Sequence, residues 1–167
     1  IVGALALAIA GFNPLEAYKI MFEGIFGSPK YISWTIVRST PLILTGISVA
    51  FAFKTGLFNI GAEGQYIIGS LVATLVGYFF KLPIVIHAIV AILAGCLAAA
   101  IWGGIAGLLK AKFGINEVIT TIMLNWTALY LSNYVVFWEP FKRPNRDASQ
   151  QILDTARIEI LANWKVS

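Results

Sequence analysis

Four long apolar runs dominate the chain, and each is long enough to cross a membrane once as a helix. They cover residues 32–53, 57–80, 84–109 and 116–138. The hydrocarbon core of a bilayer is about 30 Å thick and needs about 20 consecutive apolar helical residues. Turns of only a few residues separate the runs, so neighbouring helices must be antiparallel. The sequence therefore predicts an all-α, polytopic membrane bundle.

Two shorter segments precede these runs. Residues 1–11 are apolar but too short to span a bilayer, and we interpret them as part of a truncated first helix, making about five spanning helices in all. Residues 14–26 repeat apolar side chains every three or four positions, between a helix start at Asn13 and Pro14 and a stop at Gly27. This pattern predicts a short helix in the membrane interface.

The composition excludes several classes of function. Hydrophobic residues make up 59% of the 167 and charged residues 12%, against roughly 45–50% and about 25% in soluble domains. One cysteine and one histidine, His87, cannot build a disulfide framework or a Cys/His metal cluster. The basic residues form no run interleaved with aromatics outside the polar tail. We therefore expect no metal site and no nucleic-acid partner.

Glu63 lies in a segment, GLFNIGAEGQ, whose glycines weaken a helix. An ionisable side chain inside a spanning helix costs about 2.5–3.5 kcal/mol on insertion scales. Gly56, Gly61 and Gly64 each lower helix propensity by about 1 kcal/mol relative to alanine, which predicts a glycine-interrupted third helix. A break at membrane depth is tolerated only against protein or a water-filled cavity. The candidate pathway residues here are Asn59, Glu63 and Gln65. Tight helix packing with polar side chains is the alternative.

A polar stripe runs along the run 116–138. Glu117, Thr121 and Asn125 recur every four residues and so share one helix face, which Asn133 continues. We interpret the first three as further candidates to line a pathway. One position on, an aromatic stripe consists of Trp126, Tyr130, Tyr134 and Trp138. This stripe could stack on a planar ligand, although such residues more often face lipid.

Small residues recur at strict intervals of four along the run 84–109. They are Ala91, Gly95, Ala99, Gly103 and Gly107. This small-xxx-small pattern lets helix backbones approach closely, so we expect a packing seam. His87 lies near the turn at residues 81–83, and we interpret it as an interfacial residue without a catalytic partner.

Two stretches are specific enough to indicate a family. Residues 40–70 (TPLILTGISVAFAFKTGLFNIGAEGQYIIGS) and 107–136 (GLLKAKFGINEVITTIMLNWTALYLSNYVV) together closely resemble the permease subunit of bacterial ABC importers for nucleosides. That group also includes permeases for ribose and other simple sugars and, more distantly, for branched-chain amino acids. NPLEAYKIMFEGIFGSP also looks like the family's segment after its first helix. The resemblance covers nearly the whole chain, and its specificity lies in GLFNIGAEGQ together with FGINEVITTIMLN.

The resemblance implies a transport subunit and no enzymatic activity in this chain. Such a permease forms half of a transmembrane pathway beside a second permease subunit. ATP-binding-cassette ATPase subunits hydrolyse ATP outside the membrane, and an extracytoplasmic substrate-binding lipoprotein delivers the nucleoside. ATP would bind to those partners, so no cofactor is expected here. The implied location is the bacterial plasma (inner) membrane, in which the protein is multi-pass.

Carried over residue by residue, the family's motifs match two groups of positions in this chain. They are Gly56, Asn59, Gly61, Glu63, Gly64 and Gln65, followed by Asn116, Glu117, Thr120, Thr121 and Asn125. Family members are about twice as long and carry a coupling helix in their second half. No such segment occurs before Ser167, so we expect the chain to be an N-terminal fragment.

Two lines of reasoning predict opposite orientations of the chain in the membrane. The positive-inside rule alone would place the polar tail, residues 139–167, in the cytoplasm. The resemblance implies a cytoplasmic amino terminus and therefore an extracytoplasmic tail, and we follow it because the loops match one for one. The basic residues of the tail, Lys142, Arg143 and Arg146, would then meet an acidic rim on the binding protein or form a solvated loop.

Four other functions compete with an importer for nucleosides. A simple-sugar permease would carry the same motifs, and a passive channel or facilitator could use the same broken helix and polar stripe. A membrane-embedded enzyme would need a nucleophile with a base in reach or clustered metal ligands, and neither occurs. A purely structural subunit would not need Glu63 and Glu117.

Overall fold

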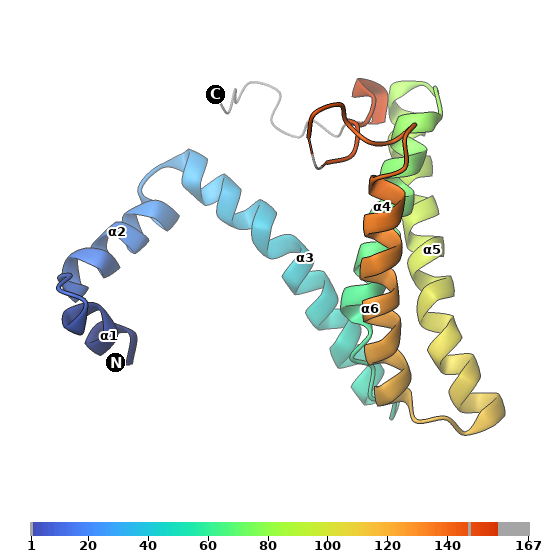
Figure 1. Ribbon diagram of the computed structural model, residues 1–167, viewed down its shortest axis with the longest axis horizontal. Coiled ribbons are helices and arrows are strands. Elements are labelled where there is room, and N and C mark those ends of the chain that lie inside the picture. Colours follow the sequence, from blue (N-terminus) through green and yellow to red (C-terminus); the bar gives the residue numbers. More distant parts are fainter. Residues whose placement is uncertain (1, 147, 157–167) are drawn as a thin grey trace. The chain divides into compact units, whose positions relative to one another are not determined.

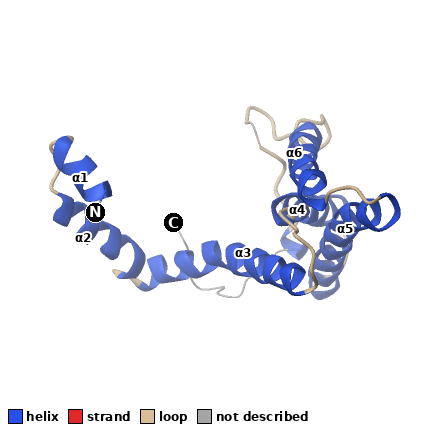
Figure 2. Cartoon of the chain, turned by 90° about the horizontal axis from the view of Figure 1, so that it is seen from below, coloured by secondary structure: helices blue, strands red, loops and turns tan. Residues whose placement is uncertain are grey.

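The computed structural model describes residues 2–146 and 148–156. Within these ranges the secondary structure is helical (Figure 2), and β pairing is limited to one isolated bridge between Lys142 and Ser149. The helices are α1 (Val2–Ile9), α2 (Pro14–Phe26), α3 (Pro29–Lys54), α4 (Ala62–Phe79), α5 (Ile84–Phe113) and α6 (Glu117–Val136), followed by a 3-10 turn, η1 (Asp154–Ala156). The all-α class agrees with the sequence.

Two of these helices, α3 and α5, are long and apolar enough to cross a membrane by length and composition. The expected number of about five spanning helices stays a prediction. The described residues fall into two compact units whose boundary lies within α3, after Leu44. The first contains α1, α2 and the start of α3, and the second contains the rest.

In the first unit, α2 has the bounds predicted for the interfacial helix, 14–26. Asn13 caps it, since its side-chain oxygen accepts a hydrogen bond of 3.1 Å from the backbone N–H of Leu15. Proline occupies the first helical position, where a backbone N–H would have no partner within the helix, so the N–H that proline lacks costs no hydrogen bond. α1 is shorter than the predicted 1–11, because Gly11, at φ +83°, ends its last turn.

The predicted run 57–80 is wrong at its start, because residues 57–61 are not helical and α4 begins at Ala62. α3 ends at Lys54, and Gly56 just after it has a left-handed φ of +79°. The N–H groups of Gly56 and Leu57 bond back to the carbonyls of Phe53 and Ala52 at 3.1 and 3.0 Å, a Schellman arrangement. The interruption therefore separates α3 from α4 and does not fall inside one helix.

α4, α5 and α6 lie side by side (Figure 1). α4 and α5 touch backbone to backbone: a Cβ added at Gly95 would lie 2.8 Å from the carbonyl oxygen of Gly69, and one added at Gly69 would lie 3.2 Å from the Cβ of Ala99. Ala91 is also buried. Gly107 departs from the expected seam, because an added Cβ there would meet nothing within 4 Å.

Two further helix ends differ from the predicted runs. α5 continues past residue 109 to Phe113, so Lys110 and Lys112 belong to its last turn, and Gly114 ends it at φ +64°. Lysine fits the last turn of a helix because its long side chain can carry the charged amine into a polar environment, and because the helix dipole favours a positive charge at this end. α6 starts one residue later than predicted because Asn116 caps it, and it ends at Val136. α3 begins earlier, at Pro29.

The tail after α6 is folded against α4 and α5, whereas a polar loop was expected over residues 139–167. Phe141 is 0% exposed and packs beside Tyr78 and Phe79, with ring centroids 5.6 and 6.2 Å away. The backbone N–H of Leu153 bonds to the carbonyl of Gly77 at 2.9 Å. Residues 147 and 157–167 lie outside the described residues. Apolar side chains such as Phe141 thus make part of the tail a packed cap.

Candidate functional site

The non-helical segment 57–61 brings several of the predicted site residues together. Asn59 makes a local turn, because its Oδ1 accepts a hydrogen bond of 2.7 Å from the backbone N–H of Gly61. Gly61 occupies the cap position of α4 and has no side chain to bond the first N–H groups of that helix. The start of α4 therefore depends on groups from elsewhere in the chain.

Asn125 of α6 supplies those groups. Its Oδ1 accepts a hydrogen bond of 2.8 Å from the backbone N–H of Gly64, in the first turn of α4. Its Nδ2 donates at 3.1 Å to the carbonyl of Ile60. A side chain on one helix thus caps another and also satisfies a carbonyl of the non-helical segment. This requirement accounts for an amide at position 125, since an amide both donates and accepts.

Two glycines of the motif are required by the close approach of α4 to α6. A Cβ added at Gly64 would lie 2.7 Å from Oδ1 and 3.0 Å from Cα of Asn125. A Cβ added at Gly61 would lie 2.8 Å from Oδ1 of Asn59 and 3.1 Å from Cβ of Thr121. Gly56 is required for its left-handed φ.

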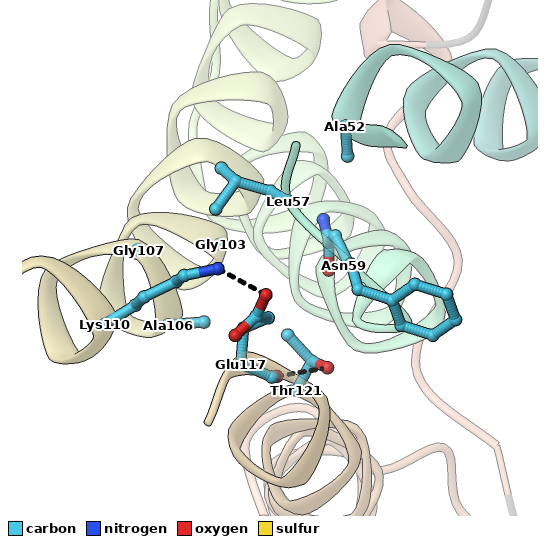
Figure 3. A pocket seen from close by; sticks show the side chains of 10 residues that line it. Ala52, Leu57, Asn59, Gly103, Ala106, Gly107, Lys110, Glu117 and Thr121 are labelled. Atoms are coloured by element: carbon cyan, nitrogen blue, oxygen red, sulfur yellow. Dashed lines mark hydrogen bonds and ion pairs between the residues drawn. The ribbon is translucent and has the colours of Figure 1, made fainter. Parts of the chain in front are cut away.

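Glu117 forms an ion pair with Lys110 of α5 (Figure 3). Glu117 stands at the first position of α6, where the helix dipole favours a negative charge. The ion pair therefore connects the end of α5 to the start of α6.

A first hollow of about 80 Å³ adjoins this ion pair. Figure 3 shows its wall, to which Asn59, Glu117 and Thr121 contribute polar groups. The other lining residues are Ala52, Leu57, Phe58, Gly103, Ala106, Gly107 and Lys110. Gly107 opens onto this space, which explains why it does not take part in the helix seam.

A second hollow, of about 230 Å³, shares no lining residue with the first. Glu63 of α4 lines it together with four residues of α6, Ile122, Asn125, Trp126 and Leu129. Glu63 and Asn125, predicted as site residues from separate motifs, therefore share one wall.

Gln65 lines neither hollow, and the hydroxyl of Thr121, in the wall of the first, bonds within its own helix. The side chain of Gln65 packs against Gly103, where an added Cβ would lie 2.5 Å from its Nε2. The Thr121 hydroxyl donates to the carbonyl of Glu117 at 2.8 Å, so its hydrogen goes to its own helix. Asn133 is exposed and lines neither hollow. In the aromatic stripe, Trp126 stacks on Tyr130 at 6.2 Å between ring centroids.

His87 was expected at the interface, yet it is 0% exposed. Its Nε2 lies 3.2 Å from the carbonyl oxygen of Val76, and its Nδ1 lies 2.7 Å from the hydroxyl of Thr155. A carbonyl can only accept, so Nε2 carries a hydrogen, and in the neutral imidazole Nδ1 then accepts from the hydroxyl of Thr155. His87 thus holds η1 against α4. The partner lies 68 positions away, and no local pattern signals it.

Comparison with known proteins gives one family and several relatives. The family model described as the permease component of the branched-chain amino acid transport system matches residues 31–162. The guanosine ABC transporter permease NupP of Bacillus subtilis is 46% identical over 134 residues, which are 80% of this chain and 38% of the relative. The nucleoside ABC transporter permease NupB of Lactococcus lactis subsp. cremoris is 33% identical over 170 residues, 100% of this chain and 47% of the relative.

The glucose ABC transporter permease TsgB13 of Haloferax volcanii is 41% identical over 135 residues, which are 81% of this chain and 36% of the relative. The chain thus spans less than half the length of these three relatives. No solved structure matches it.

Proposed function

Because the chain belongs to the family of permease components of branched-chain amino acid transport systems, we propose that it forms part of the translocation pathway of an ABC importer for nucleosides. The membership agrees with the resemblance found in the motifs. Two relatives, at 46% and 33% identity, are named for guanosine and nucleosides. Because this chain covers less than half of each, the activity of the complete protein is part of the proposal.

The non-helical segment 57–61 is the observation that supports a pathway. It follows the apolar helix α3 and is held by polar groups, because the amide of Asn125 bonds to the carbonyl of Ile60 and the side chain of Asn59 bonds to the N–H of Gly61. Broken helices in transporters occur where backbone groups line a cavity or a binding site. Both hollows adjoin this segment or the start of α4.

The partners follow from the proposed function. A second permease subunit would complete the pathway, ATPase subunits would supply the energy, and an extracytoplasmic binding lipoprotein would deliver the nucleoside. The assembly would lie in the bacterial plasma membrane, with the tail outside. There the hairpin closed by the bond from Arg143 N–H to the carbonyl of Ala148, at 2.9 Å, would present Lys142, Arg143 and Arg146 to an acidic surface of the binding protein.

A simple-sugar importer is the second candidate, and the relative named for glucose, at 41% identity, favours it. A sugar and a nucleoside share hydroxyl groups, but only a nucleoside carries a planar base. A passive channel would need neither ATPase nor binding protein.

The test is uptake of labelled guanosine and uridine by cells with and without the intact gene, with excess unlabelled ribose and glucose as competitors. We expect gene-dependent uptake that neither sugar reduces and that stops when the partner ATPase is inactivated. Competition by ribose or glucose would favour a sugar importer, uptake without the ATPase would indicate a facilitator, and unchanged uptake after deletion would refute the assignment. At equal membrane levels, Glu63→Ala should impair this uptake.

A further inference from the structure

The hollow lined by Glu63 combines three kinds of group that suit one ligand. It offers a carboxylate from α4, an indole from Trp126, and apolar walls from Ile122 and Leu129. Its volume of about 230 Å³ is below the roughly 300–1,000 Å³ of typical ligand pockets. It would therefore hold one ring system of a solute while the rest of the solute lies outside.

The Glu63 carboxylate has no partner among the described residues: no donor lies within hydrogen-bond distance and no cation within ion-pair distance. A carboxylate facing lipid would be costly, and acidic groups in membrane helices almost always face a polar space. The wall that carries Glu63 therefore faces a polar pathway or another polar surface. An ionised carboxylate can only accept hydrogen bonds, so its ligand must donate.

The aromatic part of the lining is Trp126, which stacks on Tyr130 outside the hollow. Trp126 and Tyr130 stack with their ring planes 27° apart, and the side chains remain 58% and 66% exposed. Asn125, next to Trp126, is held by its two bonds to Gly64 and Ile60. The amide therefore does not have to be ordered by the ligand, and the exposed ring of Trp126 offers a face of the kind on which bases stack in nucleic-acid complexes.

A planar base with adjacent N–H donors fits this combination. The six-membered ring of guanine presents a ring N–H beside an exocyclic amino group, and a carboxylate can accept from both at once. Hypoxanthine, the base of inosine, has the ring N–H but lacks the amino group. Ribose alone has hydroxyl donors but no planar face for Trp126.

We propose that this hollow is the contact of the translocation pathway with the base of the nucleoside. Trp126 stacks on the base, and Glu63 accepts hydrogen bonds from its N–H edge, with a preference for guanosine over inosine. The inference rests on the proposed function, because it names the part of the solute that this site would contact.

The experiment compares maximal uptake rates of labelled guanosine and inosine by the full-length protein in cells. Saturating nucleoside removes the contribution of the binding protein's affinity, so the ratio of the two rates reports on the pathway. The variants are Glu63→Gln, Trp126→Ala and Trp126→Phe, with membrane levels measured by immunoblot. Tyr134→Ala is the control, because Tyr134 lies on the same helix, is 75% exposed and lines neither hollow.

We expect Glu63→Gln to lower the guanosine-to-inosine rate ratio at least threefold, because glutamine replaces one of the two acceptor oxygens with an NH2 donor that faces the donors of guanine. Trp126→Ala should lower both rates about tenfold, Trp126→Phe should keep most of the activity, and Tyr134→Ala should match the wild type. An unchanged ratio in Glu63→Gln, or wild-type rates in Trp126→Ala, would overturn the inference while gene-dependent uptake still supported the importer. Absence of gene-dependent uptake would instead refute the proposed function.

Discussion

Asn125 of α6 accepts a hydrogen bond of 2.8 Å from the backbone N–H of Gly64 in α4, 61 positions earlier in the chain. The same amide donates to the carbonyl of Ile60 at 3.1 Å. A single side chain therefore both caps a helix and satisfies the non-helical backbone before it. The relationship explains why a glycine motif and a polar stripe occur in one sequence, and it leads to the first two predictions.

Replacing Asn125 with alanine should destabilise the full-length protein by about 1–3 kcal/mol, because the N–H of Gly64 and the carbonyl of Ile60 would lose their partner. Thermal unfolding of the purified protein in detergent measures this loss. Asn133→Ala is the control, since Asn133 lies on the same helix and is exposed. Equal melting temperatures for the two variants would contradict the capping role of Asn125.

Adding a methyl group at Gly64 should force α4 and α6 apart. The new Cβ would lie 3.0 Å from Cα of Asn125, and overpacking of this kind costs about 1–3 kcal/mol. Gly104→Ala is the matched control, because nothing lies within 4 Å of its added Cβ and alanine is favoured in helices by about 1 kcal/mol. The same unfolding measurement should show a lower midpoint for Gly64→Ala and no decrease of the midpoint for Gly104→Ala. A Gly64→Ala variant as stable as the wild type would rule out this packing.

The ion pair between Lys110 and Glu117 should respond to a charge exchange. Lys110→Glu and Glu117→Lys each place like charges together and should lower both uptake and thermal stability, whereas the double exchange should recover part of each. A double-mutant cycle on the melting temperatures isolates the coupling between the two side chains. Lys112→Glu serves as the control, because Lys112 lies in the same turn of α5 and is exposed. Additive effects would show that the pair makes no contribution.

The bond between His87 and Thr155 should hold the packed cap in place. Thr155→Val removes the hydroxyl that donates to Nδ1 at 2.7 Å, which should cost about 0.5–1.5 kcal/mol. We expect faster limited proteolysis within residues 142–156, read by mass spectrometry of the released peptides. Thr127→Val is the comparison, since that hydroxyl bonds only within its own helix. Identical cleavage rates in the two variants would show that the bond between His87 and Thr155 does not hold the packed cap in place.

Several features were accessible from the sequence because they depend on nearby residues. Apolar runs predicted the helices, Asn13 and Pro14 predicted the start of α2, and the family was evident from two motifs whose residues adjoin one another. The exact start of α4 was not accessible. The apolar character continues through residues 57–61. However, the left-handed Gly56 ends α3, and the cap that Asn125 of α6 provides marks the start of α4.

The helical class, the apolar character and the membership of a permease family follow from the amino-acid sequence, because periodicity, composition and short motifs are local properties. The cap that Asn125 places on α4, the hollow shared by Glu63 and Trp126, and the burial of His87 beneath the tail follow from the packing of distant segments. These relationships join side chains roughly 60 to 70 positions apart. Their distances depend on how the helices pack, which no local pattern encodes.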